Sequence, residues 1–192
     1  MVFGGTALVP GIPNTGILFV DQQKDNRSGH GGITLAECKN GDILVFTEEE
    51  HLPAPMHVFR NSDHGKSWRD EEIVIYPDGA QHRDYKLMGG LVRLPLDEHD
   101  ILLFSNIDSP EGRRNGTIWA SFDGGKTWPV KRLVEEGGFA YSSMAAGREG
   151  TPSEGWIYLM YEGGGHPDSK AYIARFNLAW VTGGRDWREF IK

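Results

Sequence analysis

Ser121-Phe122-Asp123-Gly124-Gly125-Lys126-Thr127-Trp128 is the stretch of this sequence that decides the fold. An aspartate at such a place accepts hydrogen bonds from backbone N–H groups in its own turn. Glycine adopts the positive φ that a sharp turn requires, and the closing tryptophan brings a large surface to bury. The pattern therefore predicts a tight turn that supports the fold, rather than a ligand site.

The same pattern occurs 60 residues earlier, in Asn61-Ser62-Asp63-His64-Gly65-Lys66-Ser67-Trp68. The two stretches agree at the aspartate, glycine, lysine, hydroxyl and tryptophan positions. Each one lies between the third and fourth of four strand-like segments, which fall within 32–76 and 89–134. A repeat of this length built from antiparallel strands indicates a β-propeller rather than a sandwich.

The composition supports an all-β chain. The 192 residues include 26 Gly and 10 Pro for turns, and 6 Trp, 6 Tyr and 9 Phe for strands. Many short strands need many tight turns, and such chains are typical of all-β proteins. A short helix is expected only in the tail, within Trp180–Ile191. The expected strands are 32–37, 42–48, 56–61, 72–76, 90–94, 100–106, 117–122, 131–134, 141–146, 156–162 and 171–176.

Charge and hydropathy exclude several classes of partner. The net charge is −7 and no basic stripe is present, which argues against a nucleic-acid surface. No apolar run approaches the ~20 residues that a membrane-spanning helix needs. The first twenty residues lack the positively charged start of a secretion signal. Cys38 is the only cysteine, so an internal disulfide is excluded and the compartment stays open.

Metal and cofactor sites are not expected. The seven histidines have no spacing typical of metal ligands, and the acidic run 48–50 has no calcium-loop motif around it. We therefore expect no metal and no other cofactor. The histidines are His30, His51, His57, His64, His82, His99 and His166.

Four stretches around the second turn carry a resemblance to a known family. They occur in order along the chain and are Arg113–Ser121, Phe139–Met144, Ile157–Glu162 and Ile173–Trp180. Together they resemble the closing blades of an exo-α-sialidase, or neuraminidase. The two eight-residue turns resemble the Asp box, or BNR repeat, of the same family. The resemblance is strongest over about 88–180, half of the chain.

The resemblance implies a sialidase-type β-propeller made of four-stranded antiparallel blades with Asp-box turns. We expect residues 1–192 to form a single partial propeller domain, with blades at about 30–77, 88–135 and 139–180. About three blades cannot close a six-bladed ring. The chain is therefore expected to belong to a longer protein, to be truncated, or to assemble with another copy.

Three residues match the functional positions of the family. An arginine precedes the box and a tyrosine follows it, which places Arg113 as a substrate-binding residue and Tyr141 as the catalytic nucleophile, 28 residues apart. The glutamate that ends the strand Ile157–Glu162 is the second catalytic candidate, and it would hold a carboxylate-binding arginine in place. Each of them also has an ordinary structural interpretation. Tyr141 could pack, Arg113 could be a solvated charge, and Glu162 could be a strand-end charge.

The implied chemistry explains these residue types. Sialic acid carries a carboxylate on its anomeric carbon, and the planar fork of arginine matches a carboxylate. A carboxylate nucleophile would meet that group as a like charge, whereas a neutral tyrosine can approach and attack the anomeric carbon. The implied activity is hydrolysis of terminal sialic acids, with a sialylated glycan or another acidic sugar as the partner.

The sequence also departs from the family. It lacks the arginine-isoleucine-proline motif of the first blade, and Gly11-Ile12-Pro13 is the nearest tripeptide. Gly32 and Glu48 stand where a glutamate base and a second arginine would fall, and no acid/base aspartate is identified. We therefore expect little hydrolase activity from these 192 residues alone. A non-catalytic propeller that binds a glycan or a protein, and a different propeller glycosidase or lyase, stay open as alternatives.

Overall fold

The computed structural model describes residues 30–49, 57–63, 69–71, 88–96, 99–165, 167 and 169–191. Nearly all of their regular structure is β, as the sequence predicts. The strands are β1 (His30–Glu37), β2 (Ile43–Glu49), β3 (His57–Asn61), β4 (Arg69–Glu71), β5 (Gly90–Arg93), β6 (Leu102–Ile107), β7 (Arg114–Ser121), β8 (Val130–Ala146), β9 (Trp156–Gly163) and β10 (Lys170–Asn177).

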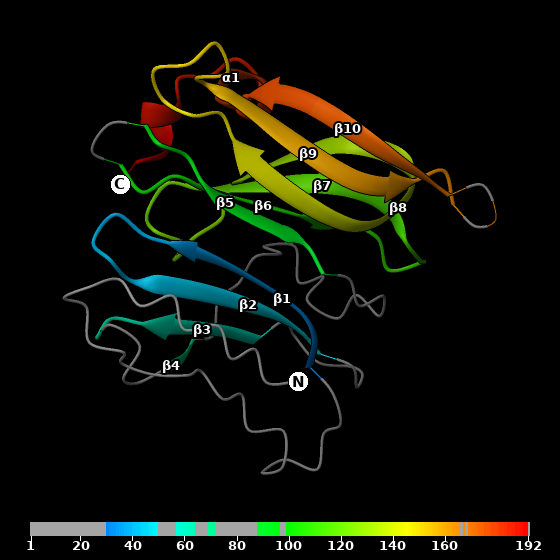
Figure 1. The fold of residues 1–192 in the computed structure, drawn as a ribbon, viewed down its shortest axis with the longest axis horizontal. Coiled ribbons are helices and arrows are strands. Elements are labelled where there is room, and N and C mark those ends of the chain that lie inside the picture. Colours follow the sequence, from blue (N-terminus) through cyan, green and yellow to red (C-terminus); the bar gives the residue numbers. More distant parts are fainter. Residues whose placement is uncertain are drawn as a thin grey trace.

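The strands form two antiparallel sheets (Figure 1). One has the order β1-β2-β3-β4, and the other has the order β10-β9-β8-β7-β6-β5. Within each sheet, strands that are neighbours in sequence pair with each other, which is the meander expected of propeller blades. The expected strand at 72–76 lies outside the described residues.

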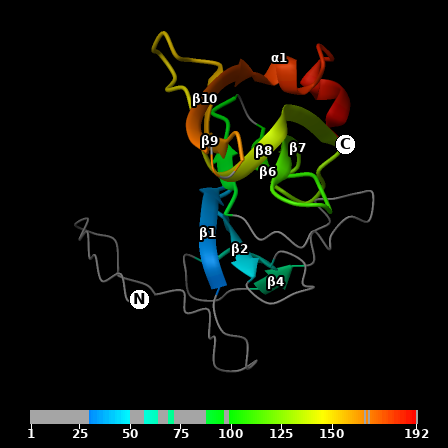
Figure 2. The same cartoon turned by 90° about the vertical axis from the view of Figure 1, so that its right-hand side faces the viewer.

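β8 differs from the expected pattern, because it joins two predicted strands into one. Its first half pairs with β7, from Val130 to Gly138, and its second half pairs with β9, from Phe139 to Ala146. Figures 1 and 2 show it as a long curved strand that β7 and β9 flank. The predicted blade limits at 135 and 139 fall inside β8, and the limit at 77 lies outside the described residues. The blade limits therefore stay a prediction.

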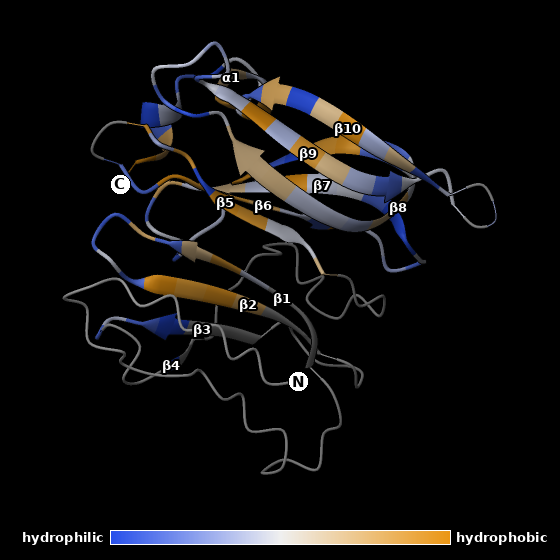
Figure 3. Ribbon diagram, viewed as in Figure 1, coloured by the Kyte–Doolittle hydropathy of each residue, from blue (hydrophilic) through white to orange (hydrophobic). Residues whose placement is uncertain are grey.

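The central strands β6 and β7 have apolar side chains on both faces. On one face Leu102, Phe104 and Trp119 pack with Leu44 and Phe46 of the first sheet. On the other face a second core joins β6 and β7 to β9, β10 and the tail, and it includes Leu103, Ile118, Leu159 and Phe176. Figure 3 shows the hydrophobic colour over much of β2 and in bands along β9. The strands thus form three stacked layers: β1–β4, then β5–β7 with the first half of β8, then the second half of β8 with β9 and β10. The middle layer contributes side chains to both cores.

The turn after β7 has the structure that its sequence predicts. Asp123 Oδ1 accepts hydrogen bonds from the backbone N–H groups of Lys126 at 3.0 Å and Thr127 at 2.9 Å. Gly124 and Gly125 have φ of 70° and 85°. Trp128 is buried between the sheets, with its ring centroid 5.8 Å from that of Phe46. The turn therefore belongs to the scaffold.

The two related turns occupy equivalent places in the two sheets. Asp123 follows β7 and precedes β8, which are the third and fourth strands of β5–β8. Asp63 follows β3 and precedes β4, the third and fourth strands of the first sheet. The rest of the first turn, 64–68, lies outside the described residues. Both aspartates thus follow the third strand and precede the fourth, and the equivalence of the two complete turns stays a prediction.

The tail is less regular than the expected helix. It forms a one-turn helix, α1 (Leu178–Val181), and a 3₁₀ turn, η1 (Trp187–Phe190). Gly183 and Gly184 between them have φ of 68° and 85°, which a continuous right-handed helix does not allow. Among the described residues, no helix is long and apolar enough to cross a membrane.

Candidate functional site

Arg113 lies in the loop that enters β7 and is held there by the backbone. Its carbonyl oxygen accepts a hydrogen bond from the N–H of Phe139 at 2.9 Å. Asn115, two residues on, is the one described non-glycine residue with positive φ, at 57°. Its side chain donates to the Asp108 carbonyl oxygen at 3.3 Å, which helps to support this conformation. The loop before β7 therefore has a defined shape.

Arg113 and Tyr141 are in contact. The guanidinium carbon of Arg113 lies 5.1 Å from the centroid of the Tyr141 ring, within the range of a cation–π interaction. Tyr141 is 40% exposed, so its ring is open to solvent as well as to the arginine. The cation and the phenol thus border one exposed region, at the start of β7 and within β8.

A register shift in the pairing of β8 with β9 places Glu162 opposite Tyr141. Phe139 of β8 pairs with Gly163 of β9, and Ser142 pairs with Tyr161. Two residues of β8, one of them Tyr141, therefore stand opposite Glu162 alone, which defines a β-bulge. The side chains of Tyr141 and Glu162 are exposed, while their neighbours Phe139, Ser142 and Tyr161 are buried.

The strand that carries Tyr141 is anchored to the preceding sheet layer through its neighbour Ser142. The Ser142 hydroxyl lies 2.8 Å from the hydroxyl of Ser105 in β6, and both side chains are buried. Ser105 Oγ also accepts a hydrogen bond from the N–H of Gly90 at 2.9 Å. The N–H of Ser142 donates to the Met88 carbonyl oxygen at 3.2 Å. These bonds fix the position of β8 relative to β6 and to Met88, directly beside Tyr141.

A second tyrosine–glutamate pair lies nearby, and the sequence reasoning missed it. The Tyr161 hydroxyl donates to Glu135 Oε2 at 3.3 Å. Burial, and then the Glu135 carboxylate, raise the pKa of Tyr161. Tyr161 is only 7% exposed and its ring lies in the second core, so the pair has a structural role. No motif marks the pair, because 26 residues separate its members.

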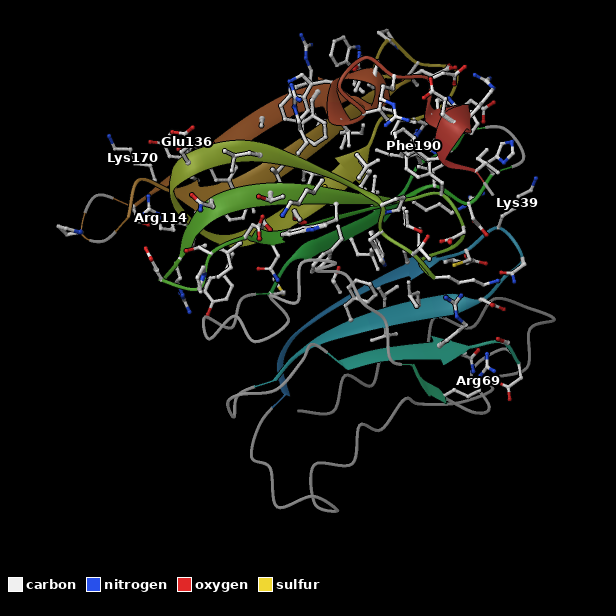
Figure 4. The ribbon with its side chains drawn as sticks, turned by 180° about the vertical axis from the view of Figure 1, so that it is seen from behind. Lys39, Arg69, Arg114, Glu136, Lys170 and Phe190 are labelled. Carbon is white, nitrogen blue, oxygen red and sulfur yellow. The ribbon has the colours of Figure 1, made fainter. Side chains whose placement is uncertain are left out.

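The site and the Asp123 turn lie at opposite ends of the six-stranded sheet. In Figure 4, Arg114, next to Arg113, appears at the end that also carries Glu136 and Lys170. Lys39 appears at the other end. Both the Lys39 and Gly124 N–H groups donate to Asp100, so Lys39 marks the turn. The candidate site therefore lies away from the Asp123 turn, at the other end of the strands.

Other ligand types find little support near this region. Among the described residues, no three histidine, cysteine, aspartate or glutamate side chains are grouped to hold a metal ion. Gly32 lies in β1 and Glu48 in β2, so at these two positions the first sheet carries neither the glutamate base nor the second arginine of the family. The chemistry that the described site offers is that of one arginine, one phenol and one carboxylate.

Sequence comparison identifies relatives of the chain. A sialidase of Micromonospora viridifaciens is 41% identical over 83 residues, which are 43% of this chain and 11% of that protein. A sialidase of Bacteroides fragilis (strain YCH46) is 27% identical over 150 residues, which are 70% of this chain and 26% of that protein. This chain is a relative of the sialidases. It spans only a minor part of the length of either curated relative. No protein-family model matches it.

Solved structures give the fold of this sialidase relative. The Hadza microbial sialidase Hz136 superposes with a TM-score of 0.57 at 24% identity, over 78% of this chain and 28% of that one. An α-L-arabinanase of Penicillium chrysogenum gives a TM-score of 0.52 at 20% identity, over 76% of this chain and 45% of that one. The predicted all-β, partial sialidase-type propeller is confirmed. The arabinanase shows that the fold alone does not select a substrate.

Proposed function

We propose that this sialidase relative forms the part of a sialic-acid site that grips the sugar carboxylate and supplies a tyrosine nucleophile. The observation that carries the proposal is the contact between Arg113 and Tyr141 at 5.1 Å, with Glu162 opposite the bulge that holds Tyr141. Residues from two neighbouring sheet layers meet at this point. Tyr141 is 40% exposed, so its contact with Arg113 adds little to the core, and a role in binding explains it better than a role in packing.

Each residue has a role in the proposed reaction. Arg113 binds the carboxylate of the terminal sialic acid and fixes the ring above Tyr141. The Tyr141 oxygen then attacks the anomeric carbon as its proton passes to a base. The bond to the leaving oxygen breaks, and that oxygen takes a proton from an acid. Water next displaces the tyrosine, so the sugar leaves with its configuration retained.

Glu162 completes the proposed site as a positioning charge. Its carboxylate stands at the end of β9, beside the tyrosine and away from the two cores. There it would orient a carboxylate-binding arginine and keep the site from becoming purely cationic. The acid of the reaction and further arginines would come from outside the three residues described. The proposal therefore concerns one part of an active site.

The test is titration of the 192-residue chain with N-acetylneuraminic acid, followed by NMR. We expect binding that Arg113→Ala abolishes and Arg114→Ala leaves within about twofold, since Arg114 carries the same charge one residue away. No binding by the unchanged chain, or an equal loss in both variants, would overturn the proposal.

A second measurement separates a hydrolase from a binding module. A 4-methylumbelliferyl sialoside reports hydrolysis, and any release must fall by about 10² or more in Tyr141→Phe. Ser143→Ala, two residues along β8, is the matched control and should keep its rate. Sugar binding without release supports the alternative of a non-catalytic glycan-binding propeller. This alternative rests on the one arginine assigned to the site among the described residues, which is enough to bind a carboxylate without catalysis.

A further inference from the structure

Phe139 lies close to all three residues of the candidate site. Its N–H donates to the carbonyl oxygen of Arg113 at 2.9 Å. It lies two residues before Tyr141 on β8 and pairs with Gly163, the residue after Glu162. Its side chain is 1% exposed and has no polar atom, so it takes no part in binding a sugar. Its contacts are nonetheless concentrated where the site is assembled.

The Phe139 ring fills a space that the chain leaves open for it. A Cβ atom on Gly116 would overlap this ring, so the absence of a side chain at Gly116 lets the ring lie against β7. On its other side the ring stacks on Tyr161, with centroids 4.9 Å apart and an angle of 20° between the planes. Tyr161 in turn stacks on Tyr172 of β10 at 5.4 Å. One ring therefore links β7, β8 and β9.

We propose that Phe139 is a positioning residue that fixes Arg113, Tyr141 and Glu162 relative to one another, a role that rests on the proposed function of the site. Its backbone sets the Arg113 loop, and its ring sets the spacing between β7 and β9. The bulge at Tyr141 begins directly after it. A displaced Phe139 would disturb both the loop and the bulge, because its N–H bonds to the loop and the bulge begins at the next residue.

The first test measures the contact between Arg113 and Tyr141 by NMR chemical shift, without a ligand. Protons of the Arg113 side chain feel the ring current of Tyr141, and Tyr141→Leu defines the size of that shift. In Phe139→Leu and in Gly116→Ala we expect at least half of the shift to be lost. Gly116→Ala keeps every candidate residue and the ring itself, and its Cβ atom forces the packing between the ring and β7 to change.

Phe46→Leu is the matched control. Phe46 is also 1% exposed and loses the same atoms, but it lies in the core between the first sheet and β6. We expect a similar fall in Tm with the ring-current shift unchanged. If Phe139→Leu and Gly116→Ala also leave the shift unchanged, Phe139 is an ordinary core residue and the proposal is wrong. Should Phe139→Leu fail to fold, the result for Gly116→Ala decides.

The second test uses N-acetylneuraminic acid as the probe, well below the Tm of each variant. Phe139→Leu and Gly116→Ala should weaken binding about tenfold or more, because small misplacements of positioned groups are costly. Phe46→Leu should stay within about twofold. If Arg113→Ala binds like the unchanged chain, the proposed function has failed, and the ring-current result still judges the role of Phe139. If Arg113→Ala loses binding while both Phe139-directed variants keep it, only the positioning role has failed.

Discussion

The Arg60 guanidinium donates a hydrogen bond to the Gly124 carbonyl oxygen at 2.9 Å, which ties β3 of the first sheet to the turn after β7. Arg60 is 5% exposed, and its other terminal nitrogen lies 3.5 Å from the carboxylate of Asp42. The backbone of the Asp123 turn therefore serves as an acceptor for the neighbouring layer. This bond connects two sheets that otherwise meet mainly through apolar side chains.

Arg60→Met should destabilise the protein by ~2–4 kcal/mol, because it leaves the Gly124 carbonyl and a partly buried Asp42 without this partner. Urea unfolding followed by tryptophan fluorescence measures the change. Arg185→Met is the control, since its ion pair with Glu189 is exposed and should be worth less than about 1 kcal/mol. Equal losses in the two variants would contradict a special role for Arg60.

Asp123→Ala should lower stability at neutral pH by ~1–3 kcal/mol, because the Lys126 and Thr127 N–H groups lose their acceptor. Burial opposes ionisation of Asp123, but hydrogen bonds from Thr127, Ser121 and Lys126 outweigh it and lower the pKa of the carboxyl. A lowered pKa in the folded state means that this stabilisation is complete above the ordinary aspartate value and is lost as pH falls below about 4. The difference between wild type and variant should narrow there, in thermal scans from pH 7 to 2. A stability difference between wild type and Asp123→Ala that stays constant with pH would show that the ionised carboxylate is not what stabilises the turn.

Ser105→Ala and Ser142→Ala should each cost ~1–3 kcal/mol, because each leaves the other buried hydroxyl without its partner at 2.8 Å. In the double variant both hydroxyls are gone, so its cost should be smaller than the sum of the two. Chemical unfolding of all four proteins gives the coupling free energy. Additivity within about 0.5 kcal/mol would show that the two hydroxyls do not act as a pair.

Tyr161→Phe should make the protein less sensitive to high pH. Burial and then the Glu135 carboxylate raise the pKa of Tyr161, so the folded state favours the neutral phenol. The stabilisation from this shift is present below the ordinary tyrosine value and is lost as pH rises above about 10. Wild type should therefore lose stability faster than the variant between pH 9 and 11. Glu135→Gln removes one cause of the pKa shift, so its loss of stability between pH 9 and 11 should lie between those of wild type and Tyr161→Phe. Parallel stability curves for wild type and Tyr161→Phe would exclude the effect.

Local patterns predicted most of the fold. The turn after β7 was predictable from eight residues because its hydrogen bonds lie within the turn itself, from Asp123 to Thr127. The strands were predictable because apolar stretches alternate with turn residues. The continuity of β8 was not, since Gly137 and Gly138 suggest a break. In the structure, pairing of Arg114 with Gly138 carries the strand through.

Predicting the candidate site depended on order along the chain and on residue types. Arg113 and Tyr141 were chosen by the motifs around them, and their contact follows from how two sheet layers pack. The roles of Phe139 and of the Ser105–Ser142 pair could not be predicted in the same way. Their importance comes from partners 23 to 37 residues away, such as Gly116 and Ser105, and no local pattern encodes such distances.

The single strand β8 has a consequence for cooperativity. Its Val130–Gly138 half completes the sheet of β5, β6 and β7, and its Phe139–Ala146 half begins the layer of β9 and β10. If β9 and β10 separated from the sheet, the unpaired edge of β8 would be exposed, and β8 also pairs with β7 in the middle layer. Amide protons in β7 and β9 should then exchange with solvent through the same opening event and with similar protection, so that the two layers form one unfolding unit.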